Sequence, residues 1–366
     1  MSAPEMTAGD PAALAALETA GPPLLTAAGG GVEERDRKAE HIRLALDPRM
    51  QLGGHSYFDD YRFEHEALPE IDLDEIDTAV DFLGRRLAAP LLISSMTGGT
   101  EMAGRINRHL AEGAERAGVA VGVGSQRKAL EDPAKADTFR VREVAPEAVL
   151  LANLGAVQLN YGMGVRECRQ AVEMIGADAL ILHLNPLQEA IQPEGQCNFS
   201  GLLSKIGEVV REVGVPVVVK EIGCGISEAT ARALAAQGVR IVDTAGVGGT
   251  SWARIEAERA RDLEIGELFA GWGLPTPESI RQVRRVEGLT VIASGGIRNG
   301  LDAAKAIALG AGLAGLAYPF LAPAMESAER VAEKVRRTVR ELRICMFCLG
   351  VKTIAELQRV KLVKGL

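Results

Sequence analysis

The amino-acid sequence predicts an α/β fold in which eight parallel strands close into a barrel. Short runs of β-branched and other apolar residues, each ending in Gly, Ser, Asn or Pro, occur eight times along the chain. Amphipathic stretches with apolar residues at helical spacing separate many of these runs. Continuous apolar strands alternating with helices are typical of a parallel sheet covered by helices, and eight such units are the number that closes a (β/α)8 TIM barrel.

In chain order, the predicted strands are 90–96, 119–124, 149–155, 179–185, 216–222, 240–246, 290–295 and 312–319. Predicted helices between them include 103–117, 168–175, 228–237, 276–286 and 300–309, and C-terminal helices are expected at 325–342 and 353–360. An open doubly wound sheet is the rival architecture. It usually carries its Gly-rich turn after the first strand, whereas Gly pairs follow the first, sixth and seventh strands here, which favours the barrel.

The segments that precede the barrel have a different character. Residues 1–31 are rich in Ala, Gly and Pro and lack periodicity, so they predict a flexible N-terminal extension. Residues 32–86 carry charges and aromatic side chains and are expected to pack as a lid or as the floor of the barrel. We expect residues 32–366 to form a single domain.

Composition narrows the class of protein. The chain has 366 residues, 41 Lys and Arg against 49 Asp and Glu, and a net charge of −8, which gives no broad footprint for nucleic acid but leaves small anions as possible ligands. There is no stretch of about 20 apolar residues and no secretory signal pattern, so a cytoplasmic protein without a membrane partner is expected. The five cysteines are expected to be reduced thiols.

Glycines near the last two strands predict a phosphate site. Gly295 and Gly296 follow the seventh strand, with Arg298 close behind, and the eighth strand contains Gly315. Glycines near the ends of these two strands let backbone N–H groups approach a phosphate, and the start of a helix adds a favourable dipole. Ordinary tight turns are the alternative explanation for the paired glycines.

Residues at the ends of the first and fifth strands suit a phosphorylated flavin. The run from Ser95 to Gly99 offers bare backbone and a hydroxyl to the edge of a flat ring. Lys220 ends an apolar strand beside Glu221, so it is either half of a buried ion pair or a cation beside an electron-rich cofactor.

Strand four and its loop concentrate polar side chains. His183, Asn185, Gln188 and Glu189 lie within seven positions, giving neutral donors for a substrate and one carboxylate. Mg²⁺ usually takes one or two protein carboxylates together with phosphate oxygens, so Glu189 is a candidate metal ligand if the substrate is a diphosphate, and a solvated loop glutamate otherwise.

Candidate binding residues also occur in other segments of the chain. Arg127 follows the second strand, and Arg37, Lys38 and His41 precede the barrel, although short charge runs are usually solvated faces. Trp252 and Glu256 are four residues apart in a predicted helix and share one face, which could also pack on the sheet.

These segments together resemble the type 2 isopentenyl-diphosphate isomerases, flavin-dependent barrel enzymes that interconvert isopentenyl and dimethylallyl diphosphate. The likeness runs from about Arg37 to Leu366 and rests on the ordered segments 37–41, 95–99, 125–127, 153–155, 183–189, 219–221, 249–252 and 295–298. The extension before Val32 departs from the pattern, as does Ala245, which stands where some relatives have a hydroxyl residue near the flavin.

The resemblance implies roles for particular residues. FMN would be held by Met96, Thr97, Gly98, Ser125, Asn153, Lys220, Thr250, Gly295, Gly296, Arg298, Leu316 and Ala317. The substrate would contact Arg37, Lys38, Ser125, Gln126, Arg127, His183, Asn185 and Gln188, with Mg²⁺ on Glu189 and with Gln188, Glu256 and His183 as catalytic candidates. The family likeness also implies NADPH as the reductant of the flavin and a homotetramer or homo-octamer.

The reaction implied is a 1,3-allylic proton shift without net redox change. Our hypothesis is that reduced FMN, stacked on the olefin, acts as acid and base and stabilises the developing positive charge. A flavin-dependent 2-hydroxyacid oxidase would need a His base late in the barrel, and no His follows His183. A non-catalytic FMN-binding protein would not require the polar run from His183 to Glu189.

Overall fold

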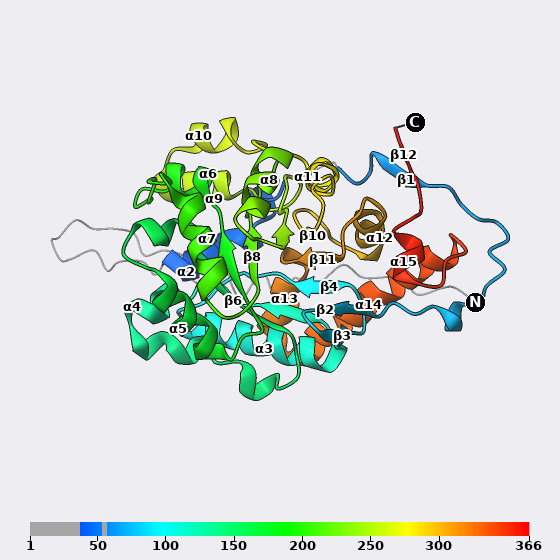
Figure 1. Ribbon diagram of the computed structural model, residues 1–366, viewed down its shortest axis with the longest axis horizontal. Coiled ribbons are helices and arrows are strands. Elements are labelled where there is room, and N and C mark those ends of the chain that lie inside the picture. Colours follow the sequence, from blue (N-terminus) through cyan, green and yellow to red (C-terminus); the bar gives the residue numbers. More distant parts are fainter. Residues whose placement is uncertain (1–36, 53–56, 366) are drawn as a thin grey trace, which may run out of the picture. The chain divides into compact units, whose positions relative to one another are not determined.

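The predicted eight-stranded parallel barrel is present in the computed structural model of the protein, which describes residues 37–52 and 57–365 (Figure 1). Its strands are β4 (Leu91–Ile93), β5 (Ala120–Gly122), β6 (Leu150–Gly155), β7 (Ala179–His183), β8 (Val217–Lys220), β9 (Ile241–Asp243), β10 (Thr290–Ala293) and β11 (Leu313–Leu316). Strand β11 pairs in parallel with β4, with Ala314 opposite Leu91, and so closes the barrel. The fold prediction is therefore confirmed. The predicted tail at residues 1–31 lies outside the described part of the chain.

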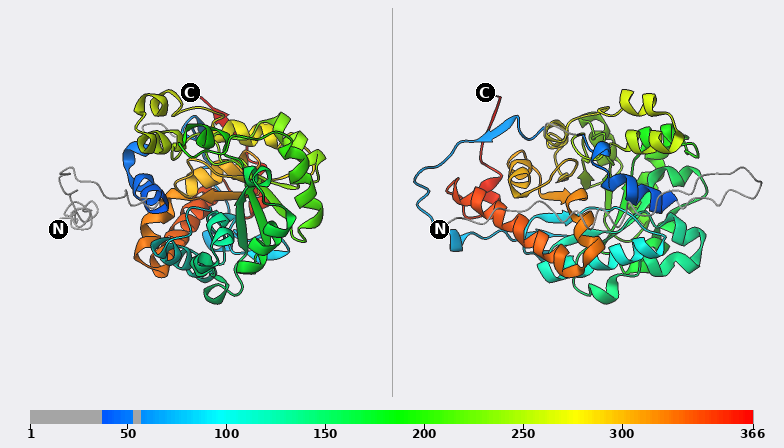
Figure 2. Two further views of the ribbon diagram at one scale, coloured as in Figure 1. Left: turned by 90° about the vertical axis from the view of Figure 1, so that its left-hand side faces the viewer. Right: turned by 180° about the vertical axis from the view of Figure 1, so that it is seen from behind.

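Helices surround the strands in the two views of Figure 2. The helices that follow successive strands are α3 (Glu101–Ala117), α4 (Arg127–Glu131), α5 (Val165–Ile175), α7 (Leu202–Glu212), α8 (Glu228–Ala236), α11 (Thr276–Val283), α12 (Gly300–Ala308) and α13 (Tyr318–Glu326). The second unit is the exception, because α4 has only five residues and is followed by 3-10 turns. Pro133 at the start of the first 3-10 turn prevents α4 from continuing.

Helix α3 illustrates how the local sequence fixes these elements. Thr100 accepts a hydrogen bond from the N–H of Ala103 and caps the helix start, while Gly118 ends it in the left-handed conformation at φ 66°. The buried side chains of α3 include Ile106 and Leu110, which recur at helical spacing and pack into the main core. Caps and apolar spacing therefore set both the length of the helix and the face it turns to the barrel.

The segment before the barrel supplies both a floor and a wall. Strands β2 (Val80–Phe82) and β3 (Arg85–Leu87) form a hairpin, and its Phe82 and Leu87 pack with the interior barrel residues Leu92, Leu151 and Ile181. Helix α2 (Arg37–Leu46) instead lines the cavity described below. The hairpin fits the expected floor, whereas α2 forms part of the cavity wall.

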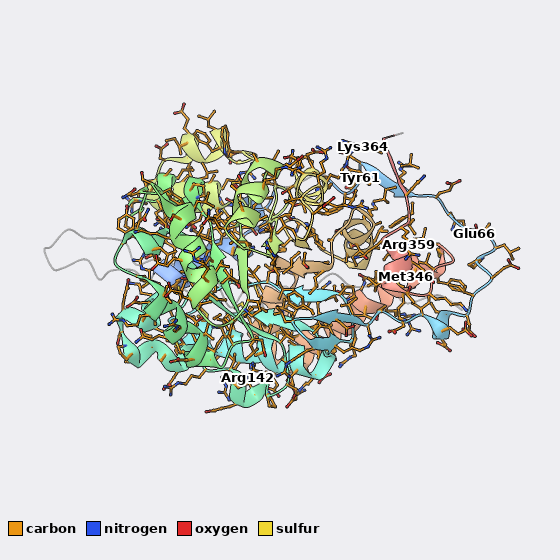
Figure 3. The ribbon with its side chains drawn as sticks, viewed as in Figure 1. Tyr61, Glu66, Arg142, Met346, Arg359 and Lys364 are labelled. Carbon is orange, nitrogen blue, oxygen red and sulfur yellow. The ribbon has the colours of Figure 1, made fainter. Side chains whose placement is uncertain are left out.

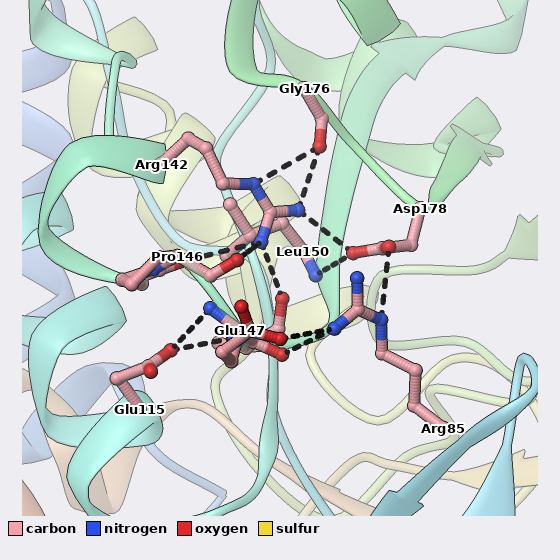
Figure 4. Close-up of polar contacts among 10 residues, drawn as sticks. Arg85, Glu115, Arg142, Pro146, Glu147, Leu150, Gly176 and Asp178 are labelled. Carbon is pink, nitrogen blue, oxygen red and sulfur yellow. Dashed lines mark hydrogen bonds and ion pairs between the residues drawn. The ribbon is translucent and has the colours of Figure 1, made fainter.

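A polar network ties the floor hairpin to the strands at the end opposite the mouth (Figure 4). Arg142 donates to the carbonyl oxygens of Gly176 and Ala148 and to the carboxylate of Asp178, which precedes β7. Arg85 of β3 lies 3.5 Å from the same carboxylate and 3.1 Å from that of Glu147. These contacts tie the hairpin to the strands at this end of the barrel.

The C-terminal region differs from the prediction in its boundaries. Strand β11 ends at Leu316, and residues predicted as its end begin helix α13. The single helix expected at 325–342 is two helices, because Ser327 is extended and its hydroxyl caps α14 (Ala328–Phe347). The helix expected at 353–360 is only α15 (Ile354–Leu357).

The last strand and its partner were not predicted from the sequence. Strand β12 (Leu362–Lys364) pairs antiparallel with β1 (Tyr61–Phe63), and the Lys364 ammonium lies 5.7 Å from the centre of the Tyr61 ring (Figure 3). Both strands are three residues long, too short to give an alternating pattern. In the described residues, no helix has both the length and the apolar character required to cross a bilayer.

Candidate active site

A cavity of about 230 Å³ opens at the carboxyl ends of the barrel strands. Predicted site residues that line it are Lys38, Met96, Thr97, Ser125, Arg127, Asn153, His183, Asn185, Gln188, Glu189, Lys220, Thr250, Gly295, Gly296, Arg298 and Ala317. Parallel strands all present their carboxyl ends at one face of a closed barrel, which explains why residues so distant in sequence meet there. Arg37 begins α2, but its side chain lies outside the described part of the chain.

Unpartnered hydroxyls mark the end of β4. The side-chain oxygens of Ser95 and Thr97 are buried without a hydrogen-bond partner, although both residues line the cavity. Buried polar atoms in native proteins are almost always satisfied, so a ligand that hydrogen-bonds here fits this part of the site. Gly98 does not line the cavity, because it packs against the Phe139 ring.

A buried charge network connects β8, β9 and β10. The Lys220 ammonium lies 3.5 Å from Asp243 Oδ2, and Ser294 donates to Asp243 Oδ1 at 2.6 Å. Asp243 is 1% exposed. Asp243 was not among the predicted site residues, although a carboxylate at the end of the apolar run Ile241–Asp243 was a detectable signal.

Glu221 is not the charge partner of Lys220 that the ion-pair alternative assumed. Lys220 Nζ donates to the main-chain oxygen of Glu221, while the Glu221 carboxylate accepts the N–H groups of Ile222, Gly223 and Cys224. Burial raises the pKa of Glu221 to about 7, and these N–H groups act in the opposite direction. Glu221 therefore shapes the loop after β8.

His183 is held in one orientation by Asn153. The Asn153 amide donates to the main-chain oxygen of Val123, so its carbonyl oxygen faces His183 Nδ1 at 2.8 Å and accepts the Nδ1 proton. Desolvation, and then the charges of Lys38 and Lys220, lower the pKa of His183 to about 3. His183 is therefore neutral near pH 7, with Nε2 left as an acceptor.

Gln126 does not join the predicted substrate contacts. Its side chain is fully buried, donates to the main-chain oxygen of Ala171 and accepts the Asn153 N–H. Leu316 is also absent from the cavity wall, because its side chain packs in the core. In both cases the neighbouring residue, Arg127 or Ala317, lines the cavity instead.

Gln188, which lines the cavity, is hydrogen-bonded to the fully buried Glu256, a predicted catalytic residue that does not itself line the cavity. Gln188 Nε2 donates to Glu256 Oε1 at 2.7 Å, and His41 Nε2 lies 3.0 Å from the same oxygen. Burial acts to raise the pKa of Glu256, but its contacts with His41, Gln188 and Arg259 outweigh burial and lower the pKa. Trp252 packs edge-on against the His41 ring at 5.4 Å, so α9 (Trp252–Ala260) and α2 meet here.

Glu189 offers a carboxylate and a neighbouring free acceptor. Its Oε1 accepts from Asn185 at 2.8 Å, and its Oε2 accepts from Gln192 and from the Gln196 N–H. Asn185 Oδ1 is buried without a partner. The described residues contain no cluster of three or more metal-ligating side chains, so a hard cation here would need oxygens from a ligand.

The loop predicted to bind a phosphate has glycines in backbone conformations that favour glycine. Gly295 and Gly296 have φ values of 98° and 75°, and a Cβ on Gly296 would lie 2.5 Å from the Gly248 carbonyl carbon. The Arg298 guanidinium lies 5.5 Å from the centre of the Tyr318 ring, beside the start of α12. Only glycine fits this close packing against Gly248, and both glycines line the cavity where a phosphate is expected.

Two remaining predicted residues have partners within the chain. Arg127 Nε lies 2.8 Å from Glu131, and Thr250 Oγ1 accepts from Gln51 at 2.9 Å. Ala245, where a hydroxyl was expected, lines the cavity and has a positive φ of 35°. The cavity wall therefore lacks a side-chain hydroxyl at this position.

Comparisons with known proteins agree with this geometry. A family model described as FMN-dependent dehydrogenase matches residues 52–149 and 190–364. The chain is 53% identical over 332 residues to an isopentenyl-diphosphate delta-isomerase of Synechococcus sp., covering 88% of this chain and 94% of that protein. It is 50% identical over 331 residues to the protein of that name from Nostoc sp., covering 89% of this chain and 95% of that protein.

Solved structures share the fold at low sequence identity. Mandelate oxidase with (S)-2-phenylpropionate superposes with a TM-score of 0.61 and 19% identity, covering 89% of this chain and 91% of that chain. At this identity the likeness establishes the barrel alone.

Proposed function

The chain belongs to the family of FMN-dependent isopentenyl-diphosphate delta-isomerases, and from that premise we propose that it interconverts isopentenyl and dimethylallyl diphosphate by a 1,3-allylic proton shift, supplying isoprenoid precursors. One observation carries the proposal beyond FMN binding. The cavity wall holds Gln188, Asn185 and Glu189, and Gln188 is hydrogen-bonded to the buried Glu256 behind the wall; a flavin carrier would not need this polar set.

FMN fits one side of the cavity. Ser95 and Thr97 offer unpartnered hydroxyls, Lys220 offers a cation fixed by Asp243, and Gly295 and Gly296 offer bare backbone. Arg298, Ala317, Met96, Ser125, Asn153 and Thr250 complete the residues that would hold it. Bound in its reduced form, FMN supplies an electron-rich ring and acid–base groups to an olefin that ordinary side chains protonate poorly.

The diphosphate fits the remaining polar part of the cavity wall. Lys38, Arg127 and Asn185 line the cavity there, and Glu189 with Asn185 Oδ1 would hold Mg²⁺ together with phosphate oxygens. The neutral His183 presents Nε2 as an acceptor rather than a permanent positive charge. Phosphate recognition would then depend on Lys38, Arg127 and the metal.

Glu256 Oε1 is the acceptor at the end of a hydrogen-bonded path from the cavity. Asn185 Nδ2 donates to Gln188 Oε1 at 3.0 Å, which fixes the amide so that its Nε2 meets Glu256. His41 reaches the same carboxylate oxygen. Gln188 connects the cavity to a fully buried carboxylate and is suited to relay a proton between them.

The family likeness supports proposals for the reductant, the assembly and the location of the protein. We propose NADPH as the reductant of the flavin, a homotetramer or homo-octamer as the assembly, and the cytoplasm as the location. Anaerobic reduction by NADPH followed by absorbance, and light scattering of the purified protein, test the first two.

The function itself is tested by one reaction. Purified protein is mixed anaerobically with FMN, dithionite, Mg²⁺ and isopentenyl diphosphate in deuterated water, and the products are followed by NMR. Deuterated dimethylallyl diphosphate, absent when the flavin is left oxidised, is the expected result. Flavin binding with unchanged substrate refutes the isomerase and directs a screen toward 2-hydroxyacid oxidation, the activity class weighed from the sequence.

Gln188→Ala tests the relay separately. It should slow turnover by about 100-fold, within the range typical of a lost proton-transfer group, while FMN content stays at the wild-type level. Unchanged turnover would remove Gln188 from the mechanism.

A further inference from the structure

Arg259, in the last turn of α9, joins three separate segments through one guanidinium. Its Nη1 lies 2.5 Å from Glu256 Oε2, its Nη2 lies 2.9 Å from Glu194 Oε1, and its Nε lies 3.3 Å from Glu40 Oε2. Glu40 belongs to α2, and Glu194 lies in the loop after α6 (Pro186–Ile191). The Arg259 side chain is 11% exposed.

The planar fork of arginine is what this cluster requires. Each of the three nitrogens faces a different carboxylate, and a lysine ammonium could not meet all three at the same distances. The carboxylates carry three negative charges, and that of Glu256 is fully buried. Without Arg259 they would repel one another, so the segments would separate or Glu256 would take up a proton.

Both of the other segments form walls of the cavity. Next to Glu40, α2 places His41 beside Glu256, and Lys38 of the same helix lines the cavity. The loop with Glu194 contains Gln192, which donates to Glu189, the candidate metal ligand. A shift of either segment would therefore move side chains that face the substrate.

We propose that Arg259 is a positioning residue that fixes α2 and the loop after α6 against Glu256, and thereby sets the geometry of the Gln188–Glu256–His41 contacts without touching the substrate. The inference rests on the proposed isomerase function for its kinetic consequence. Its structural consequence, the immobilisation of α2, is independent of that function.

The experiment compares Arg259→Met, Arg259→Lys, Glu40→Gln and Glu194→Gln with wild type. The control is Arg232→Met, which removes an exposed arginine that binds Glu228 on α8. Measurements are kcat and KM for isopentenyl diphosphate in the reduced holoenzyme, FMN content, and amide hydrogen exchange of residues 37–46.

Arg259→Met should lower kcat/KM by about 10- to 100-fold, as expected when reacting groups shift by up to an ångström, with FMN content unchanged. Exchange in residues 37–46 should accelerate by about tenfold or more. Glu40→Gln should raise KM by about 3- to 10-fold and accelerate the same exchange, and Arg259→Lys should fall between Arg259→Met and wild type. Arg232→Met should leave all three measurements unchanged.

The proposal is overturned if kcat/KM of Arg259→Met stays within threefold of wild type, or if exchange in residues 37–46 does not change. If Arg259→Met does not fold, Glu40→Gln and Glu194→Gln test the proposal instead. Wild-type KM together with wild-type amide exchange in both of these variants would overturn the proposal. An inactive wild-type protein would instead refute the proposed function. The amide exchange of residues 37–46 would then be the test of the role of Arg259.

Discussion

Replacing Asp243 by Asn should strongly destabilise the flavin-free protein. Asn keeps the shape of the side chain and can still accept from Ser294 and from the Ala245 N–H through Oδ1. What is lost is the negative charge at Oδ2, 3.5 Å from the Lys220 ammonium. An amide N–H₂ group at that position would face the ammonium donor to donor, so Lys220 would be left with the Glu221 main-chain oxygen as its remaining hydrogen-bond acceptor in the described residues.

The size of the effect follows from distance and burial. Two unit charges 3.5 Å apart in an effective dielectric constant of about 20 attract by about 5 kcal/mol. The Lys220 and Asp243 side chains are 9% and 1% exposed, and breaking a buried pair by removing one partner typically costs about 3–5 kcal/mol. We therefore expect Asp243→Asn to lower the free energy of unfolding by about 3 kcal/mol or more.

Equilibrium urea unfolding of the flavin-free protein, followed by the fluorescence of Trp252 and Trp272, measures this loss. The matched control is Asp137→Asn, which breaks an exposed pair with Arg140 and should change stability by less than about 1 kcal/mol. The double variant Lys220→Met/Asp243→Asn removes both charges and should recover most of the loss. A loss below 1 kcal/mol, or a double variant as unstable as the sum of the single variants, would refute the reasoning.

Other predictions concern His183, Gly296 and Glu189. Because the pKa of folded His183 is lowered to about 3 while an unfolded His titrates near 6.5, the unfolded chain binds more protons between these values; stability should fall as pH drops through this window, by up to about 1.4 kcal/mol per pH unit. Urea unfolding of the flavin-free protein should show a shallower pH slope in His183→Gln, and equal slopes would contradict the shift. Gly296→Ala should lower the free energy of unfolding by about 2–4 kcal/mol and reduce bound FMN, since φ is 75° and the Cβ would press on Gly248. The control Gly271→Ala has open space around it and should change the free energy of unfolding by less than about 0.5 kcal/mol. Similar losses in both variants would contradict the argument from backbone conformation. Glu189→Gln should raise the Mg²⁺ concentration for half-maximal activity by about tenfold or more after removal of metal with EDTA, and an unchanged Mg²⁺ requirement would exclude Glu189 as a ligand.

The barrel could be predicted from the sequence because its signals are local. Apolar runs and helical spacing depend on neighbours a few residues away, and eight repeats leave few ways to arrange a parallel sheet. Boundaries were less accurate where one side chain decides them, as at Ser327, which caps α14 and divides a stretch that is helical on both sides. The three-residue strands β1 and β12 had no periodicity to detect.

The site could be predicted at the level of the strand ends, but its pairings could not. The sequence placed Lys220 at the mouth and offered adjacent Glu221 as a partner, whereas the closed barrel brings Asp243 of the next strand to the ammonium. Gln126 has the right position in the motif, yet the fold turns its side chain inward to Ala171. Residue type and order do not say which way a side chain points after a turn.

The sequence by itself determined the fold class, the end of the barrel that carries the site, and the family to which the chain belongs. Only the tertiary structure decided which charges meet, as when Arg259 contacts Glu40 across 219 positions of sequence. The physical reason is that backbone periodicity is set within a few residues, whereas the partner and the ionisation of a buried group depend on the distance, burial and geometry that closure of the whole barrel imposes.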